Sequence, residues 1–143
     1  MSVLFQIALG SSILVGCTLL HIAVMIWLAQ KLRAGRAVVQ KLTVQRTFLI
    51  SSAVVSLLLL SHTVHLYVWA LSLWLLGALP SYEEPIYFAL VTYTTVGYGD
   101  VTLDPPFRIF GAMASVNGIL SFGLTTAFLV ALIPRIFVAL RER

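Results

Sequence analysis

Residues 94–100 read T-T-V-G-Y-G-D, and a long apolar segment flanks this stretch on each side. Successive backbone carbonyls point the same way only where residues alternate between right- and left-handed dihedral angles. Gly97 and Gly99 adopt left-handed angles at little cost because they lack a Cβ atom. The stretch therefore predicts an extended loop with its carbonyl oxygens on one side, and with Val96 and Tyr98 directed away from them. A glycine-rich surface turn is the alternative, which the apolar flanks disfavour.

The composition is that of an integral membrane protein. Of 143 residues, 60% are hydrophobic and 10% are charged, against about 25% charged in average soluble domains. Residues 1–30, 47–82 and 109–134 contain no charged side chain, and each run exceeds the roughly 20 residues that a membrane helix needs. We therefore expect an all-α membrane protein with three transmembrane helices. The first run has no basic start and is too long for a typical signal peptide.

The charges predict the orientation of these helices. Five basic residues and no acid lie between the first two runs, and more arginines follow the third: Lys31, Arg33, Arg36, Lys41, Arg46, Arg135, Arg141 and Arg143. Four acids and one arginine lie between the second and third runs: Glu83, Glu84, Asp100, Asp104 and Arg108. The positive-inside rule therefore places a basic linker at 31–47 and a basic tail at 135–143 in the cytoplasm. It leaves the N-terminus and the T-T-V-G-Y-G-D stretch outside a cell membrane.

Between the second and third runs we expect a re-entrant segment. Glu83 and Glu84 suit the positive end of a helix, and Pro85 suits its first position. Residues 85–94 are too few to span a membrane, so they predict a short helix that enters it and is followed by the extended residues 95–99. The expected segments are a transmembrane helix at 1–30, an outer helix at 48–79, a pore helix at 85–94, the loop at 95–99 and an inner helix at 107–133 that ends or kinks at Pro134.

Three histidines lie within these apolar runs. His21 is an intramembrane titratable residue and hence a functional candidate, although a neutral histidine hydrogen-bonded to a neighbouring helix is the favoured interpretation. His62 and His65 share a helical face. That spacing is a weak metal signal without a third ligand, and it favours packing or hydrogen bonding.

Other features are less specific. Tyr67, Trp69 and Trp74 predict an outer aromatic belt, and Gly16 predicts a close helix contact. In the linker at 31–47, an amphipathic helix and a plain basic loop both remain open.

Residues 95–99 match, letter for letter, the T-V-G-Y-G filter of potassium channels. From about residue 48 to 132 the chain resembles the pore domain of tetrameric potassium channels. Residues 117–123, N-G-I-L-S-F-G, resemble the inner-helix segment that carries the gating-hinge glycine in simple bacterial channels. The resemblance implies potassium-binding oxygens from Thr95, Val96, Gly97, Tyr98 and Gly99. It further implies filter support by Tyr87, Phe88, Thr94 and Asp100, and hinges at Gly118 and Gly123.

There are departures from the family pattern. Val91 stands where some bacterial relatives have a glutamate that pairs with the acid after the filter, so Asp100 needs another partner such as a nearby Trp or Tyr. The first transmembrane run lacks the regular arginines of a voltage sensor. The short stretch after the third run is not expected to form a ligand-binding domain.

The resemblance implies a potassium-selective channel. One filter per chain implies a homotetramer, because the pore closes only around a cyclic axis. The expected partners are further copies of the chain, the lipid bilayer and potassium ions, with no nucleic acid and no cofactor except the permeant K⁺. A non-selective cation channel and a non-conducting membrane assembly subunit are the alternatives. No catalytic motif indicates an enzyme.

Overall fold

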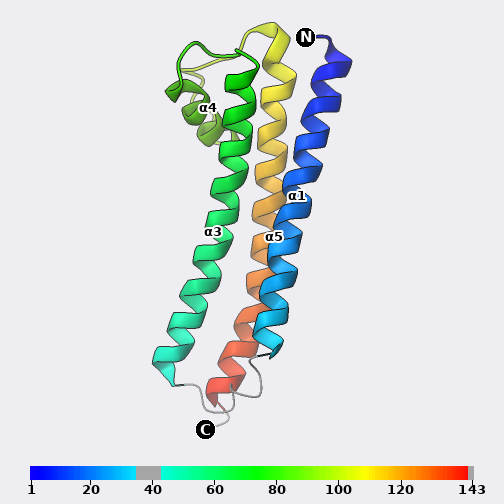
Figure 1. Cartoon of the computed structure of the whole chain (residues 1–143). Coiled ribbons are helices and arrows are strands. Elements are labelled where there is room, and N and C mark those ends of the chain that lie inside the picture. Colours follow the sequence, from blue (N-terminus) through cyan, green and yellow to red (C-terminus); the bar gives the residue numbers. More distant parts are fainter. Residues whose placement is uncertain (35–42, 142–143) are drawn as a thin grey trace.

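Three long helices form the body of the protein (Figure 1). The computed structural model describes residues 1–34 and 43–141. The long helices are α1 (Val3–Ala34), α3 (Val44–Leu75) and α5 (Arg108–Arg141), the short helix α4 is Glu83–Tyr93, and a 3₁₀ turn η1 is Pro105–Phe107. The described ranges contain no strand. The all-α prediction is confirmed.

The long helices lie side by side, and α4 lies at the end of the bundle that also holds the N-terminus (Figure 1). α1 contacts both α3 and α5, and α4 contacts α3 and α5. Three segments are long and apolar enough to cross a membrane, namely Val3–Arg33, Val44–Leu75 and Pro105–Leu132. The protein is therefore a multi-pass membrane protein, as the charge-free runs predict.

Two apolar clusters hold the helices together. The larger one surrounds Trp69, Leu73, Tyr93 and Phe110, all at most 1% exposed, and joins α3, α4 and α5. The smaller one joins α1 to α3 through Leu28, Val54 and Leu58. Trp69 was predicted in the aromatic belt, and that prediction is wrong. Its indole Nε1–H is buried and donates to Asn117 Oδ1 at 2.9 Å, because a buried indole N–H needs an acceptor.

α1 is bonded directly to the start of α5. The side-chain oxygen of Gln6 accepts the backbone N–H groups of Ile109 at 3.1 Å and Phe110 at 3.3 Å. These N–H groups belong to the first turn of α5, where no carbonyl of the same helix accepts them. One turn further along α1, a Cβ atom on Gly10 would overlap the Met113 side chain. At Gly16, where the sequence predicts a close helix contact, a Cβ atom would meet nothing within 4 Å in the single chain.

The outer helix, predicted at 48–79, instead spans Val44–Leu75. It ends early because Gly77 adopts φ +64° and closes the last turn. The Gly77 N–H donates to the Trp74 carbonyl at 2.9 Å, and the Ala78 N–H donates to the Leu73 carbonyl at 3.0 Å. This pair of bonds is a Schellman motif, in which a left-handed glycine satisfies the final carbonyls.

The pore helix, predicted at 85–94, is α4 and begins two residues earlier, at Glu83. The Ser81 hydroxyl oxygen accepts the Glu84 N–H at 3.1 Å and satisfies one N-terminal donor. Pro85 thus occupies the third helical position. A proline is tolerated there because no carbonyl within the first turn awaits its N–H.

Parts of both predicted cytoplasmic segments are helical. α5 was predicted to end at 133, but it continues through Pro134 to Arg141. A single proline removes one backbone hydrogen bond without ending a long helix. The first helix, predicted at 1–30, extends to Ala34. The linker positions 35–42, on which the amphipathic-helix interpretation depends, lie outside the described residues.

Candidate functional site

The loop after α4 alternates its backbone handedness residue by residue. Thr95 has φ +62°, Gly97 has φ +57° and Gly99 has φ +79°, whereas the intervening Val96 and Tyr98 have negative φ. This is the alternation that directs successive carbonyl oxygens to one side of a loop. The sequence predicts positive φ at the two glycines. It does not predict positive φ at Thr95, because a β-branched residue rarely adopts it.

Carbonyls of α4 hold the start of this loop in place. The Thr95 N–H donates to the Thr92 carbonyl at 3.0 Å, and the Gly97 N–H donates to the Val91 carbonyl at 3.2 Å. The Thr94 hydroxyl donates to the Leu90 carbonyl at 2.7 Å. Positive φ at a β-branched residue costs on the order of 1–3 kcal/mol. These contacts with α4 therefore maintain a backbone that Thr95 would not adopt alone.

The loop lies at the C-terminal end of α4, which ends at Tyr93 with Thr94 as its cap. A helix C-terminus carries a partial negative charge of about half an elementary charge. Carbonyl oxygens and a helix C-terminus both favour a cation and disfavour an anion. The local electrostatics are therefore those of a cation site.

The loop side chains opposite the carbonyls are uncovered in the single chain. Val96 is 52% exposed and Tyr98 is 74% exposed. Such backbone is tolerated in a membrane only where protein covers it or water contacts it. The single chain leaves these apolar side chains without that cover.

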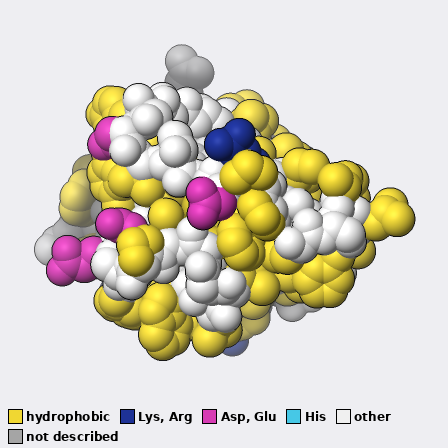
Figure 2. Space-filling view, turned by 90° about the horizontal axis from the view of Figure 1, so that it is seen from above, with side chains coloured by type: hydrophobic (Ala, Val, Ile, Leu, Met, Phe, Trp, Pro, Cys, Tyr) yellow, Lys and Arg dark blue, Asp and Glu magenta, His cyan; other side chains and the backbone are white. Residues whose placement is uncertain are grey.

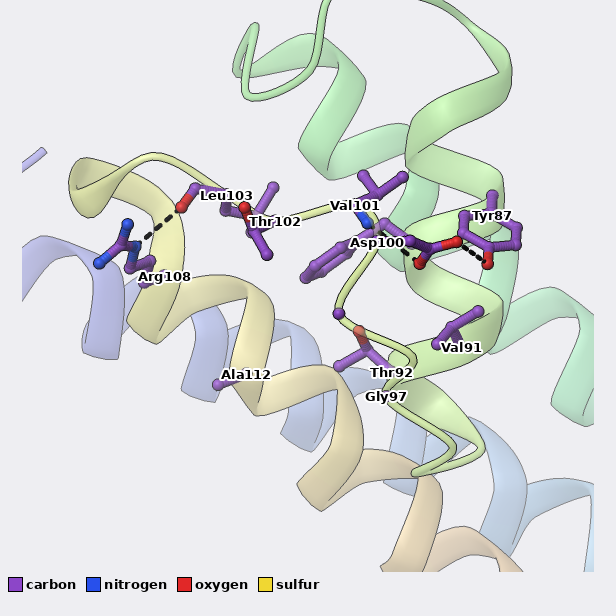
Figure 3. A pocket seen from close by; sticks show the side chains of 12 residues that line it. Tyr87, Val91, Thr92, Gly97, Asp100, Val101, Thr102, Leu103, Arg108 and Ala112 are labelled. Carbon is purple, nitrogen blue, oxygen red and sulfur yellow. Dashed lines mark hydrogen bonds between the residues drawn. The ribbon is translucent and has the colours of Figure 1, made fainter.

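Asp100 ends the loop and is bonded to α4. The Tyr87 hydroxyl donates to Asp100 Oδ2 at 2.5 Å, and the Val101 N–H donates to Oδ1 at 3.0 Å (Figure 3). Hydrogen bonds from Tyr87 and the backbone lower the pKa of the Asp100 carboxyl, because they stabilise its charged form. The expectation that a nearby Trp or Tyr replaces the missing glutamate at Val91 is confirmed for Tyr87.

The comparison with protein families covers this region. A family model described as "Ion channel" matches residues 53–134, more than half of the chain. This chain belongs to that ion channel family. The family is that of the two-transmembrane-type potassium channel pore domain, and the matched range holds most of α3, all of α4, the loop, and α5 up to Pro134. The comparisons with curated proteins and with solved structures gave no match.

Behind the loop the channel has a cavity of about 380 Å³ (Figure 3). Its lining includes three of the predicted support residues, Tyr87, Phe88 and Asp100, together with Val91, whereas Thr94 does not line it. Arg108 lies at its edge, where its Nε–H donates to the Leu103 carbonyl at 2.8 Å. A valine at position 91 leaves the wall apolar beside the carboxylate.

The two predicted hinge glycines of the channel lie in different surroundings. A Cβ atom on Gly118 would overlap the Tyr93 carbonyl oxygen, whereas one on Gly123 would meet nothing within 4 Å. α5 passes through both positions as uninterrupted helix. Gly118 therefore has a packing role at the base of α4, whatever its role in bending.

The end of the channel that carries the loop is acidic. Figure 2 shows this end, where acidic side chains lie at the left and near the centre of the view, among hydrophobic and uncharged surface. The acidic residues come from the segment between α3 and α5, namely Glu83, Glu84, Asp100 and Asp104. Within residues 1–34 and 43–141, no group of three or more His, Cys, Asp or Glu side chains is arranged to hold a metal ion.

Proposed function

We propose that the chain assembles as a homotetramer that conducts potassium selectively through the carbonyl oxygens of residues 95–99. The observation that carries the proposal is the alternation of positive φ at Thr95, Gly97 and Gly99. Four such loops around one axis present successive rings of four oxygens. These rings replace the hydration shell of a potassium ion.

Two features support assembly of four chains. Val96 and Tyr98 are exposed in the single chain, and a neighbouring copy would cover them. Each chain carries one filter loop, so an ion surrounded on all sides needs further copies about a cyclic axis. A tetramer around one axis would therefore both cover Val96 and Tyr98 and complete the ring of oxygens.

The charge distribution supports a defined orientation in a cell membrane. Glu83 and Glu84 begin α4 and Asp104 precedes η1, in the segment between α3 and α5 that also carries the loop at residues 95–99. Acidic side chains at a pore mouth raise the local cation concentration. The basic residues from Lys31 to Arg46 in the sequence favour the cytoplasmic side for the opposite end. The N-terminus and the filter therefore face outward, and the C-terminus faces the cytoplasm.

Opening of the channel is proposed to involve bending or splaying of α5. Gly123 is the better candidate for flexibility, because the space beside it is open. Gly118 is confined by the Tyr93 carbonyl, so a bend there would also disturb the base of α4.

Ion flux into proteoliposomes tests the selectivity. The purified protein is reconstituted, and uptake is measured with potassium and then with sodium as the permeant cation. We expect potassium uptake to exceed sodium uptake clearly. Equal uptake would identify a non-selective cation channel, and no uptake of either ion would favour a non-conducting assembly subunit.

A further inference from the structure

The three histidines form one buried cluster in the middle of the helix bundle. His21 from α1 and His62 and His65 from α3 are 0%, 7% and 0% exposed. Their ring centroids lie 5.0 Å apart for His21–His62, 5.5 Å for His21–His65 and 6.3 Å for His62–His65. The sequence predicts hydrogen bonds for them, but it does not predict that they meet.

A chain of hydrogen bonds begins at His21. Its Nδ1 lies 2.9 Å from Ser61 Oγ, and its Nε2 lies 2.9 Å from Thr125 Oγ1. The same Thr125 oxygen lies 2.9 Å from His62 Nε2. One threonine on α5 thus bridges histidines on α1 and α3.

The chain continues from His62 to the base of the filter. His62 Nδ1 lies 2.9 Å from the Tyr93 hydroxyl, and His65 Nδ1 lies 3.1 Å from that hydroxyl. Ser121 on α5 approaches His65 Nδ1 at 3.4 Å. Because Tyr93 is the last residue of α4, the cluster contacts every helix of the pore domain.

The number of hydrogens on these groups determines how many protons the cluster can bind. A neutral imidazole has one N–H donor and one acceptor nitrogen, and a hydroxyl donates only one hydrogen. If a proton is added to His62, both of its nitrogens donate, one to Thr125 and one to Tyr93. The Thr125 hydrogen then turns to His21, and the Tyr93 hydrogen turns to His65. The bonds from His21 through Thr125, His62 and Tyr93 to His65 are all kept, so this series of groups accepts one extra proton. His65 then carries its hydrogen on Nε2, a buried atom without a hydrogen-bond partner among the described residues.

A second proton does not fit in the same way. If His21 were also charged, the Thr125 oxygen would accept two N–H groups. The hydroxyl hydrogen of Thr125 would then find no acceptor among the histidines. The two like charges would also lie on rings with centroids only 5.0 Å apart. Like charges at such a separation inside a protein repel strongly. If His62 and His65 were both charged, the Tyr93 oxygen would likewise accept two N–H groups. The geometry therefore limits the cluster to one proton.

Phe122 on α5 favours the charge at His62. Its ring stacks on the His62 ring with centroids 4.5 Å apart and an interplanar angle of 19°. An aromatic face attracts a cation at this distance. A proton on His62 would therefore strengthen the contact between α3 and α5.

The groups that face the cluster include no charged residue. Cys17 on α1 approaches His65 and Tyr93. α4 contributes Tyr93 and α5 contributes Thr125 and Ser121. The spans from residue 47 to 82 and from 109 to 134 contain no Asp, Glu, Lys or Arg, so no carboxylate within these spans offsets the charge of an added proton. The hydrogen bonds and the Phe122 ring are the groups that stabilise that charge.

We propose that the histidine cluster is a binding site for one proton per chain, and that proton binding reduces ion flux. A charge beside Tyr93 opposes the partial negative charge at the C-terminus of α4, which favours a cation in the filter. The strengthened contact between His62 and Phe122 also restrains α5. The effect on flux depends on the proposed channel function, whereas the proton site itself does not.

Nitrogen NMR of ¹⁵N-histidine in the full chain, reconstituted in lipid nanodiscs, tests the site without any flux. The pH is lowered from about 8 to about 4, a range that extends well below the ordinary imidazole pKa of about 6.5. We expect the three side chains together to take up one proton, and His62→Gln to abolish this uptake. Histidines that stay neutral throughout, or that each take up a proton, would overturn the proposal. Phe122→Leu keeps the hydrogen-bond chain and should shift the uptake to lower pH, which provides a second variant if His62→Gln folds poorly.

Flux measurements over the same pH range test the consequence. We expect potassium flux to fall about fivefold or more, the lower end of typical coupling between two sites. His62→Gln should remove this pH dependence, and Thr63→Ala, on the exposed face of α3, should keep it. If the flux did not change with pH while the cluster took up its proton, the proposed reduction of flux by proton binding would be overturned. An absence of flux at every pH would refute the channel function, and the NMR result alone would then decide on the proton site.

Discussion

Gly118 on the inner helix α5 lies against the backbone of Tyr93, the last residue of the pore helix α4. A Cβ atom on Gly118 would overlap the Tyr93 carbonyl oxygen and come within 2.8 Å of its carbonyl carbon. Backbone cannot move aside as the end of a flexible side chain can. The position of α4, and with it the loop at residues 95–99, therefore depends on the absence of a side chain at residue 118.

Gly118→Ala should destabilise the protein by about 1–3 kcal/mol, the usual cost of overpacking a filled site. Gly123→Ala is the matched control, because a Cβ atom there meets nothing within 4 Å. The control should be neutral or slightly stabilising, since alanine favours a helix over glycine by up to about 1 kcal/mol. Thermal unfolding in detergent measures both variants, and equal stability of the two would contradict the packing role.

Gly97→Ala should abolish potassium flux. Gly77→Ala is its matched control, because the two glycines have φ +57° and +64° and a Cβ atom on either meets nothing within 4 Å. Each alanine costs about 1–2 kcal/mol at left-handed dihedral angles, so both variants should lose similar stability. Only Gly97 lies in the filter loop, so Gly77→Ala should still conduct. Loss of flux in both variants would show that stability, not loop geometry, is being measured.

Tyr87→Phe should weaken the attachment of Asp100 to α4 and speed the decline of current during sustained conduction. The Tyr87 hydroxyl helps to lower the pKa of Asp100 below its ordinary value of 3.8. A lowered carboxyl pKa stabilises the folded loop above pH 3.8, and this contribution is lost as the pH falls through the folded-state value. The difference between variant and wild type should therefore be full at neutral pH and shrink in strong acid.

Tyr82→Phe is the control for that experiment. Tyr82 is 62% exposed, and its ring packs against Trp74 rather than Asp100. Bilayer recordings of current against time compare the two variants. A decline that is equally fast in both would remove Tyr87 from the support of the filter.

Gln6→Leu should destabilise the protein by about 1–3 kcal/mol, because two N–H groups at the start of α5 lose their acceptor. The bonds to Ile109 and Phe110 link α1 to the pore domain. Ser12→Ala is the control, since Ser12 bonds only the Ala8 carbonyl of its own helix, and it should change stability by less than about 0.5 kcal/mol. Unfolding in detergent measures both, and equal effects would show that α1 does not brace the inner helix.

Much of the fold follows from local sequence signals. The charge-free runs predict the three transmembrane helices, and the short segment after Glu83 and Glu84 predicts the pore helix. The ends are less predictable. Gly77 ends α3 through its dihedral angle, and α5 continues past Pro134. The residue at which a helix ends depends on which backbone N–H and C=O groups have hydrogen-bond partners nearby.

The site is predictable where it depends on residue type and not where it depends on distant contacts. Glycine at positions 97 and 99 predicts left-handed dihedral angles, whereas Thr95 adopts a left-handed φ that a β-branched residue disfavours. His21 and Thr125 are 104 residues apart in sequence, and nothing local indicates that they meet. The same holds for Gly118 and Tyr93, whose contact arises only when α4 packs against α5.

The central claim is that peptide oxygens of residues 95–99 from four chains replace water around potassium. A density map of the assembled protein in potassium tests it most directly. We predict a fourfold particle with ion density on its axis, between successive rings of carbonyl oxygens from these residues. A particle without fourfold symmetry, or one in which the backbone of 95–99 faces lipid or bulk solvent, would contradict the claim.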